Sequence, residues 1–113
     1  MSLPEGFVSA VEGVLPRRAI IREPEQLLTY ECDGLTGQRM IPALVVLPDT
    51  SEQVQGVVRL CHAHGVPFVA RGAGTGLSGG ALPVADGVVI SLARLTRILE
   101  VDLENGRVTV EPG

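Results

Sequence analysis

One stretch of ten residues limits most strongly what this chain can fold into and bind. Residues 71–80 read Arg-Gly-Ala-Gly-Thr-Gly-Leu-Ser-Gly-Gly, so half of them are glycine. Glycine adopts positive φ angles readily and lets a ligand approach the backbone closely. Successive backbone N–H groups in such a segment can turn toward one anion. With the guanidinium of Arg71 and the hydroxyls of Thr75 and Ser78, the stretch predicts a binding loop for a phosphate or a pyrophosphate.

Two common phosphate-binding loops do not match this stretch. A Walker loop ends in Gly-Lys-Ser or Gly-Lys-Thr, and the chain contains no lysine. The dinucleotide fingerprint GxGxxG occurs at Gly74–Gly79, but in a Rossmann unit its third glycine opens a helix. Pro83 and Gly87 follow too soon for a helix. The loop is therefore expected to join two strands and to bind a pyrophosphate through its backbone amides.

A strand, a helix and a second strand are expected before the loop. Residues 43–47 are an unbroken apolar run, as in a strand covered on both faces. Thr50 and Gln53 form a capping box, and apolar residues then recur at helical spacing until Gly65 ends the helix. Residues 67–70 are interpreted as a short buried strand. This part predicts a βαβ unit, with a right-handed crossover if its two strands are parallel.

A third strand and then an antiparallel hairpin are expected after the loop. Residues 87–92 predict a third strand, and residues 97–103 alternate with the period of a strand. Asn105-Gly106 indicates a hairpin turn, and residues 107–111 alternate again. The predicted fold class is therefore α+β, a βαβ unit followed by antiparallel strands.

The first forty residues are expected to form a segment of their own. Apolar side chains recur at helical spacing between residues 7 and 15, and Pro16 follows them. A short extended stretch and a helical turn that begins at Pro24 are expected next. The predicted division is an N-terminal helical and extended segment at residues 1–40 and a first subdomain at residues 41–113.

The composition excludes several classes of function. The formal net charge is −4 and no basic run is present, which argues against nucleic acid as a partner. No apolar run approaches the length of about 18 residues that a transmembrane helix needs. Cys32 and Cys61 do not form a CxxC motif, which favours a reduced, cytoplasmic compartment. His62 and His64 stand two residues apart on the expected helix, so they point to different sides and no metal site is expected.

Three motifs together carry a resemblance to a known family. The first is the loop at residues 71–80. The second is formed by the preceding segments Val-Val-Leu-Pro at residues 45–48 and Val-Pro at residues 66–67. The third is Tyr-Glu-Cys-Asp-Gly-Leu at residues 30–35. The loop resembles the FAD pyrophosphate loop of the FAD-linked oxidases typified by vanillyl-alcohol oxidase. Within that family, the third motif is similar to the flavoprotein (D) subunit of glycolate oxidase, with the D-lactate dehydrogenases as near relatives. The resemblance covers about residues 25–113 and implies the first half of an FAD-binding domain of this type.

The resemblance implies FAD as the cofactor and assigns the residues that hold it. Residues 71–76 would supply the amides nearest the diphosphate, and residues 77–80 would continue toward the ribityl chain and the flavin. Residues 30–37 would run near the flavin domain and help to cover the cofactor. Pro48 would lie beside the adenine, and Gly113 would begin a second turn in contact with FAD. The implied set is Arg71, Gly72, Ala73, Gly74, Thr75, Gly76, Leu77, Ser78, Gly79, Gly80, Pro48 and Gly113.

The resemblance also implies a reaction and partners. A small 2-hydroxy acid such as glycolate or D-lactate would be oxidised to the 2-oxo acid, its Cα giving a hydride to flavin N5. Partner subunits would include an iron–sulfur protein, and the protein would be cytoplasmic or held at the inner membrane by those subunits. Members of the family are several times longer, so catalytic residues are expected beyond Gly113 and the chain alone is expected to be inactive.

Two other interpretations remain open. One is a stand-alone module that binds an anion or a nucleotide without chemistry. The other is a structural half-domain that holds no ligand until a missing segment packs on it. If the strand that ends at Glu111 is an open edge, the chain is also expected to self-associate.

Overall fold

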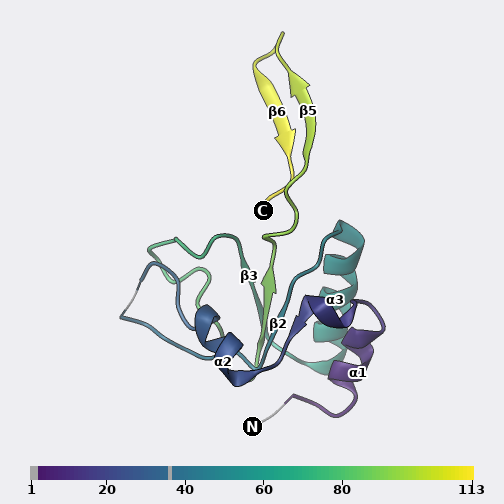
Figure 1. The fold of residues 1–113 in the computed structure, drawn as a ribbon, viewed down its shortest axis with the longest axis vertical. Helices are drawn as coiled ribbons and strands as arrows, with labels where there is room; N and C mark the ends of the chain where they lie inside the picture. The colour runs from purple at the N-terminus through teal and green to yellow at the C-terminus, as the bar shows by residue number, and fades with distance from the viewer. Residues whose placement is uncertain (1–2, 36) are drawn as a thin grey trace.

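The computed structural model describes residues 3–35 and 37–113 and has an α+β fold, as the sequence predicts (Figure 1). Its elements in chain order are α1 (Phe7–Glu12), the 3₁₀ turn η1 (Arg17–Ala19), β1 (Ile20–Ile21), α2 (Pro24–Leu27), the 3₁₀ turn η2 (Leu28–Tyr30), β2 (Leu44–Val46), α3 (Ser51–His64), β3 (Phe68–Arg71), β4 (Val88–Ser91), β5 (Ile98–Asp102) and β6 (Arg107–Val110).

Four strands form the central sheet in the order β1-β2-β4-β3. Both β2 and β3 run parallel to β4, with Leu44 and Phe68 each opposite Val88. The predicted βαβ unit is therefore present, and β4 lies between its two strands. The short strand β1 pairs antiparallel with β2 at the other edge. Because parallel strands end at one edge of a sheet, the segments that follow β2, β3 and β4 leave from the same side.

The interpretation of β3 as a buried strand is wrong. In the part of the chain that the structure describes, β3 has β4 as its single neighbour, and the side chain of Phe68 is 43% exposed. The reason is topological: the chain returns from the glycine loop into β4, which takes the central position and leaves β3 at the edge. An apolar run predicts a strand, but it does not predict the place of that strand in the sheet.

Helix α3 begins and ends at the residues that the sequence indicates. The Thr50 side chain accepts a hydrogen bond from the Gln53 amide at 3.1 Å. The Gln53 side chain accepts from the Asp49 amide at 2.9 Å, one residue earlier than an ideal capping box requires. Gly65 ends the helix with a φ of 66°, the left-handed conformation that favours glycine at this position.

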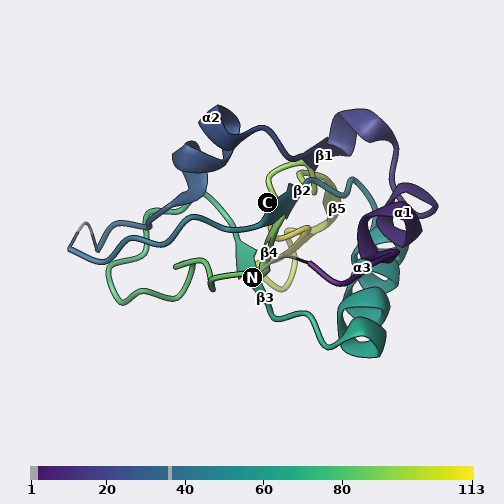
Figure 2. The same ribbon diagram turned by 90° about the horizontal axis from the view of Figure 1, so that it is seen from below.

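The core occupies both faces of the sheet. Helices α1 and α3 cover one face (Figure 2), where Phe7, Val11, Val57 and Cys61 pack with alternate residues of β2 and β4. On the other face, Leu27 of α2 packs against the remaining residues of the same strands. Strands covered on both faces are apolar at every position, which explains the unbroken runs in β2 and β4.

The hairpin of β5 and β6 extends away from the sheet (Figure 1). Its strands pair antiparallel with Val101 opposite Val108, and Gly106 in the turn has a φ of 64°. At its base, Nε of Arg97 donates to Oε1 of Glu111 at 2.7 Å, which lowers the pKa of the Glu111 carboxyl. Its apolar side chains are largely exposed: Ile98, Leu99, Val101, Leu103, Val108 and Val110. A two-stranded ribbon with both faces exposed has little stability of its own.

Candidate functional site

The glycine loop leaves the sheet at the end of β3 and returns to it at β4. Gly74 and Gly79 have φ angles of 74° and 78°, so the loop uses the conformational freedom of glycine at these two positions. Residues 72–85 contain no acidic and no basic side chain. An anion that approaches this segment therefore meets backbone and small side chains and no negative charge belonging to the segment.

The backbone amides of the loop are available to a ligand. Within residues 3–35 and 37–113, none of the N–H groups from Gly72 to Ala81 donates a hydrogen bond to another group of the protein. Gly72, Thr75, Gly76 and Gly80 are exposed, and a Cβ placed on Gly72 or Gly80 would meet no atom within 4 Å. Exposed amides without internal acceptors, on a segment without charge, fit an anion such as a diphosphate.

The side chain of Arg71 is held by a segment that is far from it in sequence. Its Nη1 atom donates to the carbonyl oxygen of Cys32 at 2.7 Å. Its guanidinium carbon lies 5.3 Å from the centroid of the Tyr30 ring. The guanidinium also lies directly against Gly74, where any Cβ would overlap it. Arg71 therefore links the start of the glycine loop to Tyr30 and Cys32.

Residues 30–35, here called the supporting turn, lie against the glycine loop. The amide of Gly34 donates to the carbonyl oxygen of Gly76 at 2.8 Å. Oδ1 of Asp33 accepts from the Leu35 amide at 2.8 Å, which closes the turn. Asp33 is 5% exposed, and its Oδ2 atom has no hydrogen-bond partner in the described part of the chain. No local pattern in the sequence predicts the contact between Gly34 and Gly76, because these residues are about forty positions apart.

Pro48 and Gly113 occupy other places at the same side of the sheet. Pro48 follows β2 after Leu47 and is fully buried. The amide of Gly113 donates to the carbonyl oxygen of Leu95 at 2.7 Å, and a Cβ on Gly113 would overlap the carbonyl oxygen of Leu92. The structure therefore brings the loop residues together with the supporting turn, and it places Gly113 against the turn that follows β4.

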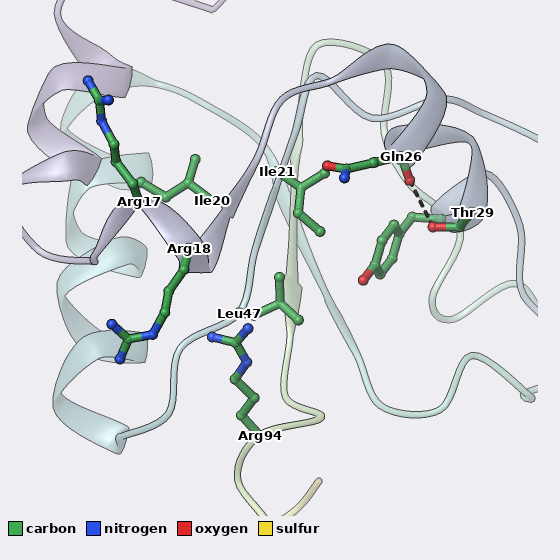
Figure 3. A pocket seen from close by; sticks show the side chains of 9 residues that line it. Arg17, Arg18, Ile20, Ile21, Gln26, Thr29, Leu47 and Arg94 are labelled. Carbon is green, nitrogen blue, oxygen red and sulfur yellow. Dashed lines mark hydrogen bonds between the residues drawn. The ribbon is translucent and has the colours of Figure 1, made fainter.

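A cavity of about 500 Å³ adjoins the supporting turn (Figure 3). Its lining consists of Arg17, Arg18, Ile20, Ile21, Gln26, Thr29, Tyr30, Leu47 and Arg94. None of the three arginines has an ion-pair partner among the residues that the structure describes. Because Arg94 is far in sequence from the adjacent pair Arg17 and Arg18, no local motif could have predicted this cavity.

The histidines and Cys61 belong to the helix and its packing. Nδ1 of His64 lies 2.9 Å from the carbonyl oxygen of Leu60, and the ring meets Phe7 edge-on at 5.4 Å. Burial raises the pKa of the Cys61 thiol to about 11, so it is not a nucleophile near neutral pH. In the described ranges, no group of three His, Cys, Asp or Glu side chains is arranged to hold a metal ion.

A family comparison indicates a cofactor that contains a diphosphate. The family model described as "FAD binding domain" matches residues 42–113. The chain belongs to this FAD-binding family. FAD carries a diphosphate, which agrees with the free amides of Gly72–Ala81. The resemblance to FAD-linked oxidases and the assignment of FAD as the cofactor are thus confirmed.

Two curated relatives show which members of the family this chain is similar to. Glycolate oxidase subunit GlcD of Escherichia coli (strain K12) is 48% identical over 104 residues, which are 92% of this chain and 21% of that protein. A D-lactate dehydrogenase of Anaerostipes hadrus is 34% identical over 95% of this chain and 22% of its own length. The chain therefore spans about a fifth of the length of the curated relatives it matches.

A solved structure agrees with the fold. A substrate-bound crystal structure of p-cresol methylhydroxylase superposes with a TM-score of 0.82 and 30% sequence identity. The superposition covers 98% of this chain and 23% of that chain. The α+β arrangement is thus that of a known flavoprotein fold.

Proposed function

We propose that the chain forms the diphosphate-binding part of an FAD-dependent 2-hydroxy-acid oxidoreductase. The single observation that carries this proposal is the row of amides at Gly72–Ala81, most of them in exposed residues, none of which has an acceptor in the described protein. The names of the relatives, a glycolate oxidase subunit and a D-lactate dehydrogenase, support the class of substrate. Both names refer to small 2-hydroxy acids.

The proposed cofactor contacts follow the order of the loop. The segment Arg71–Gly76 supplies the donors closest to the diphosphate, and Leu77–Gly80 lies toward the ribityl chain and the flavin. Pro48 lies on the adenine side, and Gly113 belongs to a second turn in contact with FAD. The guanidinium of Arg71 contributes its positive charge from its position beside Gly74, where it is also bonded to the protein.

The part of these residues in the reaction is to bind and orient the cofactor. When bound, FAD supplies the acceptor for the hydride that leaves Cα of the 2-hydroxy acid. Residues 72–85 include no acidic and no basic side chain, so they cannot take the proton of the substrate hydroxyl. We therefore give these loop residues no part in proton transfer and propose that the catalytic base and the carboxylate-binding groups lie elsewhere in the protein.

Partner proteins and location belong to the same proposal. Because one relative is named as a subunit of glycolate oxidase, we include partner subunits, one of them an iron–sulfur protein. In the described part of the chain, no helix is both long enough and apolar enough to cross a membrane. We propose a cytoplasmic location, or attachment to the inner membrane through the partner subunits. The exposed hairpin of β5 and β6 supports self-association of the chain as it stands.

An FAD titration followed by flavin fluorescence tests the proposal, with FMN and NAD as control ligands. Saturable binding that is selective for FAD is expected. In Gly72→Asp, a carboxylate would enter open space beside the proposed diphosphate, so affinity should fall by about tenfold or more through charge repulsion. Gly106→Asp is the matched control, since Gly106 is also open and lies in the turn between β5 and β6, outside the glycine loop. Preference for NAD, or equal binding by both variants, would contradict the proposal.

A further inference from the structure

Gly34 faces two successive carbonyl groups of the glycine loop. Its amide donates to the carbonyl oxygen of Gly76 at 2.8 Å. A Cβ at Gly34 would lie only 2.7 Å from that oxygen and 2.7 Å from the carbonyl oxygen of Thr75. Both carbonyl groups therefore point toward the supporting turn, and only a residue without a side chain leaves room for them.

The direction of these carbonyl groups fixes the direction of two amides. The described chain contains no cis peptide bond, and in a trans peptide the C=O and N–H groups point in opposite directions. The N–H group of Gly76 shares a peptide with the carbonyl of Thr75, and that of Leu77 shares one with the carbonyl of Gly76. Both N–H groups thus point away from the supporting turn. Neither has an acceptor within the described protein, and both residues are exposed.

The loop is held against the turn before this pair and at it. Before it, the Arg71 side chain is bonded to Cys32 and lies against Gly74. At the pair itself, the Gly34 amide donates to the carbonyl oxygen of Gly76. These contacts limit the ways in which the segment from Gly74 to Leu77 can rotate. The Gly76 and Leu77 amides are therefore oriented before a ligand arrives.

We propose that Gly34 is a positioning residue for the diphosphate of FAD, because it aims the N–H groups of Gly76 and Leu77 at the face of the loop where the diphosphate binds. The inference rests on the proposed function. It assigns a function to a residue that precedes the family match at residues 42–113, and it names the two donors within the loop.

The test compares Gly34→Ala with Gly106→Ala in the 113-residue chain. Gly106 lies in the turn between β5 and β6, and its Cβ would meet no atom within 4 Å, so this variant controls for the loss of a glycine away from the loop. Two-dimensional amide NMR follows a titration with inorganic pyrophosphate, and flavin fluorescence follows a titration with FAD. In the wild-type chain, the largest pyrophosphate-dependent shifts should fall on the Gly76 and Leu77 amides. Gly34→Ala should bind both ligands about tenfold more weakly, and Gly106→Ala should bind as the wild type does.

The possible outcomes separate this inference from the proposed function. If the wild-type chain binds neither pyrophosphate nor FAD, both proposals are overturned. If it binds them but the largest shifts lie outside Gly76 and Leu77, or if Gly34→Ala binds as tightly as Gly106→Ala, only the positioning inference is overturned. The wild-type shift map does not depend on any variant, so it decides the matter even if Gly34→Ala does not fold.

Discussion

The guanidinium carbon of Arg71 lies 5.3 Å from the centroid of the Tyr30 ring, and its Nη1 atom donates to the carbonyl oxygen of Cys32 at 2.7 Å. These contacts tie the last residue of an edge strand to the supporting turn. The glycine loop begins at that residue. An edge strand such as β3 has one hydrogen-bonded neighbour strand. The position of its last residue therefore depends more strongly on side-chain contacts than the position of the last residue of a central strand does.

The first prediction concerns the ring of Tyr30. Tyr30→Leu removes the attraction between the ring and the guanidinium and should lower the free energy of unfolding by about 0.5–1 kcal/mol. Tyr30→Phe keeps an aromatic face and should lower it less. Urea denaturation followed by circular dichroism measures both values. Equal losses in the two variants would mean that the ring face does not stabilise Arg71.

The second prediction concerns the first helix. Phe7 is fully buried between α1, α3 and the sheet, with its ring edge-on to His64. Phe7→Ala should therefore lower the free energy of unfolding by about 3–5 kcal/mol, the usual cost of an aromatic cavity in a core. Ser9→Ala on the exposed side of the same helix should change it little. A small effect of Phe7→Ala on urea denaturation would contradict the packing of α1 in this core.

Much of the fold follows from local patterns in the sequence. The capping residue Thr50 and the stop at Gly65 predict α3. The hairpin turn at Gly106 predicts the antiparallel pair of strands that it connects. Because Pro83 and Gly87 leave no room for a helix after the glycine loop, the loop was expected to join two strands, and it joins β3 to β4. These signals act within a few residues of one another, so the chain reveals them without its tertiary structure.

Other features depend on contacts across the chain and were not predicted. The central place of β4 makes β3 an edge strand, and periodicity within β3 contains no information about that order. The contact between Gly34 and Gly76 and the cavity with three arginines join distant segments. The division of the chain at residue 40 and the individual cofactor contacts remain predictions.

The third prediction concerns alkaline pH. Burial raises the pKa of Cys61 from 9.0 to about 11 in the folded chain, so the folded state holds this proton more tightly than the unfolded state. The corresponding stability is complete below about pH 9 and is lost as the pH rises toward 11, by about 2–3 kcal/mol in total. Urea denaturation between pH 8 and pH 11 measures the loss. Cys61→Val should show a smaller decline, whereas Cys32→Ala should decline as the wild type does.

The fourth prediction concerns the exposed hairpin. Val101 and Val108 lie opposite each other, and both belong to a ribbon whose Leu103 is 88% exposed. The double variant Val101→Glu/Val108→Arg replaces this apolar pair with opposite charges, which keeps a favourable cross-strand contact and leaves the net charge unchanged. If the hairpin drives self-association, the wild-type mass from light scattering should rise with concentration. The double variant should remain a monomer over the same range. A monomeric wild type, or association that is equal in both proteins, would exclude the hairpin as the contact surface.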